Sequence, residues 1–128
     1  MQLPELFIAR MRRELGESEA ALLCEALATE PSTSVRLNPW KMTSPQWPSE
    51  KVAWSCDGYS LCERPNFTLD PAFHAGAYYV QEASSQFAGY IMAQAVGGRE
   101  QCEGLRVLDM CAAPGGKSTH YASLVGKS

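Results

Sequence analysis

The stretch of the chain best suited to chemistry is a glycine-rich segment between residues 107 and 120, VLDMCAAPGGKSTH. Its first positions are apolar and suited to a strand, a Pro-Gly-Gly turn follows, and polar residues typical of a helix start come last. The sequence therefore predicts a strand over Arg106–Met110, a loop over Cys111–Lys117 and a helix over about Ser118–Leu124. Such a loop binds a negatively charged group, because free N–H donors and the helix dipole converge at the start of the helix.

Three classes of ligand compete for this loop. A dinucleotide-binding turn needs G-x-G-x-x-G, and only the adjacent Gly115 and Gly116 are present. A phosphate-binding P-loop would end in Gly116-Lys117-Ser118, but its first glycine is replaced by Cys111, and Pro114 removes an N–H group. The third class is a nucleoside cofactor with a carboxylate and no phosphate, such as S-adenosylmethionine. Composition alone does not choose among these ligands.

The elements before the loop are predicted from apolar spacing and turn residues. Apolar side chains recur every four residues from Leu3 to Leu15, which predicts a helix that ends at Gly16. A second helix is expected from an N-cap at Ser18 to about Thr29. Short strands are expected over residues 34–38, 52–54 and 59–61, with a loop between residues 40 and 50.

A third helix is expected over about Gln81–Val96, ended by two glycines. Its spacing predicts a buried face made of Val80, Ala83, Phe87, Tyr90, Ile91 and Ala95. We place a domain boundary between Asp70 and Val80 and predict domains over residues 1–72 and 73–128.

Composition excludes several functional classes. The formal net charge of −3 gives no overall basic field of the kind that marks many nucleic-acid binders. The cysteines are odd in number and their spacing forms no zinc site, so no metal is predicted and reduced thiols in a cytoplasmic protein are expected. Glu5 interrupts the short apolar start, so no signal peptide is predicted, and no run is long enough to span a membrane.

Four segments together resemble one protein family. The segment DMCAAPGGKSTH (109–120) resembles the first cofactor motif of RNA cytosine-5 methyltransferases of the NOP/Sun type. The segment HAGAYYVQEASS (74–85) resembles the region before that motif. The segments SVRLNP (34–39) and LPELF (3–7) resemble the N-terminal part of the family, most closely its bacterial 16S rRNA-type members.

This resemblance implies an α/β fold: a small α+β N-terminal domain, followed by the first strand-loop-helix of a truncated doubly wound, Rossmann-like methyltransferase domain. The cofactor it implies is S-adenosylmethionine. The residues that would border the cofactor are Cys111, Ala112, Ala113, Pro114, Gly115, Gly116 and Lys117.

The resemblance also implies a reaction, methylation of C5 of cytosine in RNA, with ribosomal RNA as the expected partner. A cysteine thiolate attacks C6 of the base, and a second cysteine helps to release the product. Both family cysteines belong to Pro-Cys and Thr-Cys motifs, and neither motif occurs in this chain. We therefore expect the chain to be an inactive N-terminal fragment of a longer enzyme, with no catalytic residue of its own. The alternative functions are a non-catalytic RNA-binding fragment and, less favoured, a P-loop nucleotide-binding protein.

Basic residues of the N-terminal half are candidate contacts for RNA phosphates: Arg10, Arg12, Arg13, Arg36 and Lys41. A solvated helix face is the commoner role for the first three. Gln81, Glu82 and Ser84 either support the cofactor loop or make capping and core hydrogen bonds, and the sequence leaves both roles open. His74 and His120 are expected to be structural. No obligate protein partner is implied.

Overall fold

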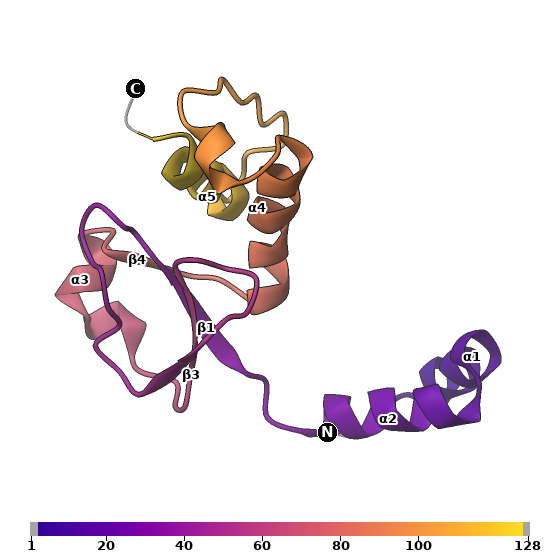
Figure 1. Cartoon of the computed structure of the whole chain (residues 1–128). Coiled ribbons are helices and arrows are strands. Elements are labelled where there is room, and N and C mark those ends of the chain that lie inside the picture. Colours follow the sequence, from indigo (N-terminus) through magenta and orange to yellow (C-terminus); the bar gives the residue numbers. More distant parts are fainter. Residues whose placement is uncertain (1–2, 127–128) are drawn as a thin grey trace. The chain divides into compact units, whose positions relative to one another are not determined.

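The computed structural model describes residues 3–126, which divide into two compact units at residues 31 and 32. The first unit is a hairpin of two helices, α1 (Glu5–Leu15) and α2 (Glu17–Ala28), in which Ala20 is the one buried residue of the two helices (Figure 1). Both helices were predicted, but α2 begins at Glu17 and not after a cap at Ser18. Gly16, with φ of 84°, lets the chain turn at a single residue, so the second helix starts directly after it.

The second unit contains a four-stranded antiparallel sheet in the order β2-β3-β1-β4 (Figure 1). The strands are β1 (Thr33–Leu37), β2 (Ser49–Lys51), β3 (Gly58–Leu61) and β4 (Tyr78–Val80). In the central strand Val35 lies opposite Tyr59 of β3 and Val80 of β4. Every residue of β1 is buried. The strand is buried on both faces because its polar residues also pack inside the unit, as described below.

The predicted strand over residues 52–54 is wrong, and β2 lies just before it. The N–H of Val52 donates to the carbonyl of Gly58, and the N–H of Ser55 donates to the carbonyl of Val52, so these residues form a turn. The apolar side chain of Val52 is buried within that turn, and the residue is not part of a strand.

An aromatic core covers one side of the sheet. Val35, Leu37 and Tyr78 pack with residues from η1 (Phe67–Leu69) and α3 (Pro71–His74). Trp47 meets Tyr78 edge to face, with ring centroids 4.9 Å apart. Asp70 accepts hydrogen bonds from the Tyr78 hydroxyl at 2.7 Å and from the Ala72 N–H at 2.9 Å. The same carboxylate therefore caps α3 and holds the core tyrosine in position.

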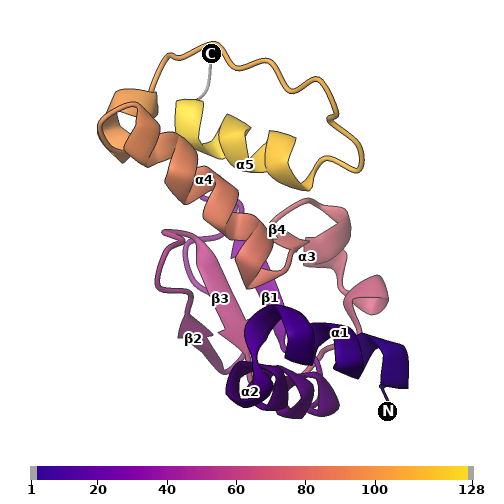
Figure 2. The same cartoon turned by 90° about the vertical axis from the view of Figure 1, so that its right-hand side faces the viewer.

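Two longer helices follow the sheet and lie side by side, α4 (Ala83–Ala95) and α5 (Gly116–Val125), joined through η2 (Arg99–Cys102) (Figure 2). The extents of α4 and α5 agree with the predictions to within two residues at each end. The predicted buried face of α4 is wrong: Phe87, Tyr90 and Ile91 are exposed, and the buried residues are Gln86, Gly89 and Ala93. Gly89 faces α5, and a side chain at this position would overlap the ring of His120.

The predicted strand over Arg106–Met110 is also absent, and the chain runs from η2 to the glycine-rich loop without regular structure (Figure 2). Leu108 and Met110 are 84% and 87% exposed. A strand forms only when a neighbour accepts and donates its backbone hydrogen bonds, and no strand of residues 3–126 lies beside this segment. The division into domains 1–72 and 73–128 stays a prediction.

Candidate functional site

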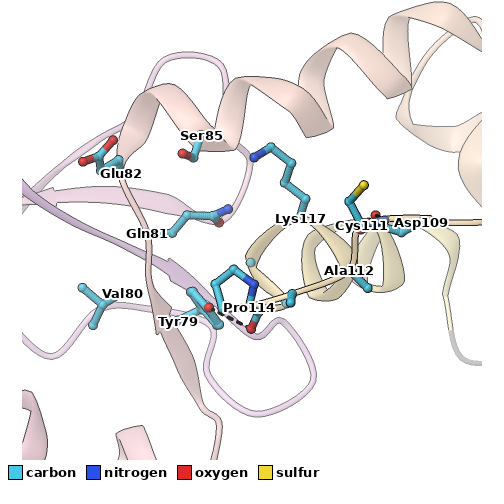
Figure 3. A pocket seen from close by; sticks show the side chains of 13 residues that line it. Tyr79, Val80, Gln81, Glu82, Ser85, Asp109, Cys111, Ala112, Pro114 and Lys117 are labelled. Carbon is cyan, nitrogen blue, oxygen red and sulfur yellow. Dashed lines mark hydrogen bonds between the residues drawn. The ribbon is translucent and has the colours of Figure 1, made fainter.

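The glycine-rich loop borders a cavity of about 530 Å³ within the second unit. One wall is the end of β4 and the start of α4, and the other is the loop between residue 109 and α5 (Figure 3). The lining residues are Tyr79, Val80, Gln81, Glu82, Ser85, Asp109, Cys111, Ala112, Ala113, Pro114, Gly115, Gly116 and Lys117. The seven residues predicted to border a cofactor, Cys111 to Lys117, therefore lie together on one cavity of a size usual for small ligands.

Two glycines shape the start of α5. Gly115 has φ of 102°, a conformation that side chains rarely adopt, and it precedes the first residue of the helix. A Cβ atom on Gly116 would lie 3.3 Å from Nε2 of Gln81, so a larger residue there would have to shift the Gln81 side chain by a few tenths of an ångström. The first N–H groups of α5 have no partner within the helix and are available at the cavity.

Asp109 joins the two ends of the loop. Its carboxylate accepts a hydrogen bond from the hydroxyl of Ser118 at 2.7 Å and from the N–H of Cys111 at 3.1 Å. The Ser118 hydroxyl, and then the Cys111 N–H, lower the pKa of this carboxyl group, so it is ionised at neutral pH. The loop is thus held in shape by a charged side chain at its start.

Arg36 anchors the helix start from the sheet. Its guanidinium donates to the Oγ1 of Thr119 at 2.8 Å, to the carbonyl of Gly116 at 3.3 Å and to the Oε1 of Gln81 at 2.9 Å. The residue is 3% exposed, and burial lowers its pKa to about 10, which still leaves it charged. Arg36 is buried and its guanidinium makes internal hydrogen bonds, so it does not form part of an exposed RNA-binding surface as predicted.

The three polar residues whose roles the sequence left open differ in the structure. Gln81 is buried, accepts from Arg36, and points toward the loop in Figure 3. It therefore makes a core hydrogen bond and lines the cavity at once. Glu82 sits at the N-cap position of α4 without a capping hydrogen bond from its side chain, and the hydroxyl of Ser84 lies 3.5 Å from its carboxylate. Tyr79, which the sequence analysis missed, donates to the carbonyl of Pro114 at 3.4 Å.

The two histidines lie outside this cavity. His120 is 5% exposed, and burial followed by the charge of Arg36 lowers its pKa to about 4, so its ring is neutral at pH 7. His74 is exposed, and its Nε2 lies 2.9 Å from the carbonyl of Thr68.

The remaining basic candidates are exposed. In α1 Arg10 pairs with Glu14 at 2.8 Å and Arg12 with Glu17 at 3.2 Å, while Arg13 is exposed beside them. Lys41 of the second unit donates to the carbonyl of Ala75. Surface ion pairs of this kind are weak, so these side chains can exchange partners at low cost.

Comparison with known proteins identifies the family of this chain. Residues 3–83 match the model of the N-terminal domain of 16S rRNA methyltransferase RsmF. The chain belongs to this family. The match includes α1, α2 and the four strands, and it ends at the first residue of α4.

Curated relatives and a solved structure extend the likeness beyond the matched domain. The chain is 28% identical to a probable ribosomal RNA small subunit methyltransferase B of Synechocystis over 96% of its length, and 30% identical to the ribosomal RNA small subunit methyltransferase F of Shewanella frigidimarina over 99%. It spans 28% of the length of each relative. A methyltransferase homologue from Pyrococcus horikoshii has a crystal structure that superimposes with a TM-score of 0.71 at 28% identity, covering 96% of this chain and 41% of that one.

Among residues 3–126 no helix is long and apolar enough to cross a membrane. All five cysteines lie in this range as free thiols.

Proposed function

We propose that this chain supplies the RNA-facing N-terminal domain and the first cofactor-binding loop of an S-adenosylmethionine-dependent enzyme that methylates C5 of cytosine in ribosomal RNA in the cytoplasm. The observation that carries the proposal is the cavity itself. The residues of the cofactor-like motif converge on one space, and they do so in a chain that belongs to an rRNA methyltransferase family.

The cavity fits the proposed cofactor chemically. The N–H groups at the start of α5 suit a carboxylate, and the two glycines let a ligand approach the backbone closely. The ionised Asp109 and the carboxylate of Glu82 suit the positive charges of the amino group and the sulfonium. When bound, S-adenosylmethionine supplies the methyl group to be transferred, and the residues of this chain hold and orient it.

A nucleotide triphosphate fits less well. The Ser118 hydroxyl, which would contact a metal ion in a P-loop, donates a hydrogen bond to Asp109 instead. The N–H of Cys111 donates a hydrogen bond to the same carboxylate. These two hydrogen bonds remove groups that a phosphate site would need.

The proposal assigns no catalytic thiolate to this chain. None of the five cysteines follows proline or threonine, and Cys111 is a loop residue of the cofactor cavity. Without a thiolate at C6, C5 of cytosine is a poor nucleophile. We expect the 128-residue chain to transfer no labelled methyl group from S-adenosylmethionine to unmodified rRNA, and labelled 5-methylcytosine formed by the purified chain would contradict this.

Differential alkylation tests cofactor binding directly. Cys111 is exposed in the cavity, and Cys62 is exposed at a separate site among Trp47, Arg64 and Pro65. We expect S-adenosylmethionine to slow alkylation of Cys111 by N-ethylmaleimide and to leave Cys62 unchanged, as read by mass spectrometry. Protection of Cys111 by ATP and not by S-adenosylmethionine would favour the P-loop alternative. RNA binding without any cofactor effect would favour the non-catalytic alternative.

A further inference from the structure

A second, smaller cavity of about 160 Å³ lies in the same unit and shares no lining residue with the cofactor cavity. It is bounded by the turn after β2, by the part of α4 that includes the buried Gly89 and Ala93, and by α5. The residues that matter to its chemistry are Trp54, Ser55, Cys56, Tyr90, Arg99 and His120. Nothing in the proposed cofactor site uses them.

Two residues that line this cavity each carry a buried polar atom without a hydrogen-bond partner among residues 3–126. These atoms are the hydroxyl of Ser55, a residue 4% exposed, and Nδ1 of His120, a residue 5% exposed. An unpaired buried polar atom costs free energy, so folded proteins rarely keep one without a use. A hydroxyl and a neutral imidazole can each donate or accept, which suits a ligand with both kinds of group on one edge.

The mouth of the cavity carries aromatic rings and cations. Trp54 and Tyr90 are large aromatic residues that stay 39% and 43% exposed, and the Trp54 indole is fixed by a hydrogen bond to the carbonyl of Ala83. Phe87 connects them, edge to face with Trp54 and stacked on Tyr90. Arg99 lines the cavity and forms an ion pair with Asp57. Lys51 does not line the cavity, but it donates a hydrogen bond to the carbonyl of Cys56, which does.

We propose that this cavity binds one unpaired nucleobase of an RNA strand, with its ring against Trp54 or Tyr90 and its polar edge toward Ser55 and His120. Proteins bind single-stranded RNA through exposed aromatic rings beside cationic side chains, because bases stack on the rings and the cations neutralise the phosphates. The volume admits one base and is below the range of larger organic ligands. The inference rests on the proposed function, since it places part of the RNA substrate on a face separate from the cofactor.

Cysteine footprinting tests the site with the chain as it stands. An unpaired fluorescein-labelled oligouridylate is expected to slow alkylation of Cys56, which lines the cavity, and to leave Cys62 unchanged. A perfect RNA duplex of the same length should not protect Cys56, because its bases are not available. Equal protection by the duplex would show a contact with the phosphates alone and would overturn the proposal.

Variants separate binding from folding. Tyr90→Ala should weaken oligouridylate binding about five-fold or more, the lower end of what a lost base–aromatic stack costs. Ser55→Ala should weaken binding and leave thermal stability unchanged or raised, because it removes an unpaired buried hydroxyl. Trp40→Ala is the matched control, since Trp40 is also exposed but lines another cavity.

The outcomes distinguish this site from the proposed function. If S-adenosylmethionine protects Cys111 and RNA does not protect Cys56, the nucleobase site is wrong and the cofactor proposal stands. If Tyr90→Ala and Ser55→Ala bind oligouridylate as the unaltered chain does, the site is also wrong. Protection of Cys56 by an unrelated peptide as strong as that by RNA would reassign the cavity to a protein partner and overturn the proposal.

Discussion

A nitrogen of the Arg36 guanidinium lies 2.8 Å from the Oγ1 of Thr119, so the central strand of the sheet holds the first turn of α5, beside the cavity that the glycine-rich loop borders. The two residues are 83 positions apart in the sequence. This contact joins the part of the chain that the family model covers to the part that carries the glycine-rich loop.

Replacing Arg36 should loosen the cavity and the fold together. Arg36→Met leaves the Oε1 of Gln81 and the carbonyl of Gly116 without their buried donor, and we expect a loss of about 2–4 kcal/mol in the free energy of unfolding. Urea denaturation measures the loss. Arg36→Lys keeps the charge and should recover part of it. Arg13→Met, on the surface of α1, should change stability by less than about 0.5 kcal/mol.

Alanine substitutions at two glycines with positive φ should have different effects on cofactor binding. Gly115 and Gly104 have φ of 102° and 76°, so Gly115→Ala and Gly104→Ala should both lower stability, by about 1–3 kcal/mol. Only Gly115 lines the cavity, and only its substitution should weaken S-adenosylmethionine binding, measured by calorimetry. Equal affinities for the two variants would argue against a cofactor at the loop.

Stability should fall in weak acid because of His120. Its pKa is about 4 in the folded chain and about 6.5 when unfolded, so between these values the unfolded state binds the proton and the folded state does not. Stability from this group is complete above pH 6.5, and about 3 kcal/mol of it is lost as the pH falls to 4. The charged groups that act on the ring are Arg36, Asp57 and Arg99. Urea titrations at pH 5 and pH 7 should differ less in His120→Gln than in His74→Gln.

The segment before the loop should tolerate polar substitution. Leu108 and Met110 are almost fully exposed, so Leu108→Lys and Met110→Lys should each change the unfolding free energy of this chain by less than about 0.5 kcal/mol. Leu37→Lys, at a buried position of β1, is the contrasting variant and should prevent folding. A large loss in Met110→Lys would mean that the segment is paired as a strand after all.

Local features of the sequence predicted the helices and the loop, because capping residues, glycines and apolar spacing act over a few residues. The pattern did not predict which side of α4 is buried. That side is chosen by a partner, since Gly89 admits the His120 ring and Phe87 has no such neighbour on α5. The strand over residues 106–110 failed for the same reason: its apolar residues fit a strand, but the pairing depends on another part of a sheet.

The cavity was predicted only on its glycine-rich side. The motif located Cys111 to Lys117, and the sequence left open a role for Gln81 beside the loop. Tyr79 on the opposite wall and Arg36 as the anchor were not predicted there. A charged residue in the middle of a strand gives no signal of burial, and its acceptors lie 45 and 83 positions away. Arg36 was therefore predicted to contact RNA because it is basic, whereas in the structure its guanidinium makes hydrogen bonds inside the fold.

The hydrogen bond between Asp109 and Ser118 spans nine positions, and this short span has a kinetic consequence. A loop of about ten residues closes within roughly 10–100 ns, whereas contacts across a whole domain wait for slower collapse. The ring between Asp109 and Ser118 can therefore close sooner than the contact between Arg36 and Thr119, which spans 83 positions. The loop can therefore take its shape from its own residues, and the anchor that Arg36 provides from the sheet depends on a contact of much longer span.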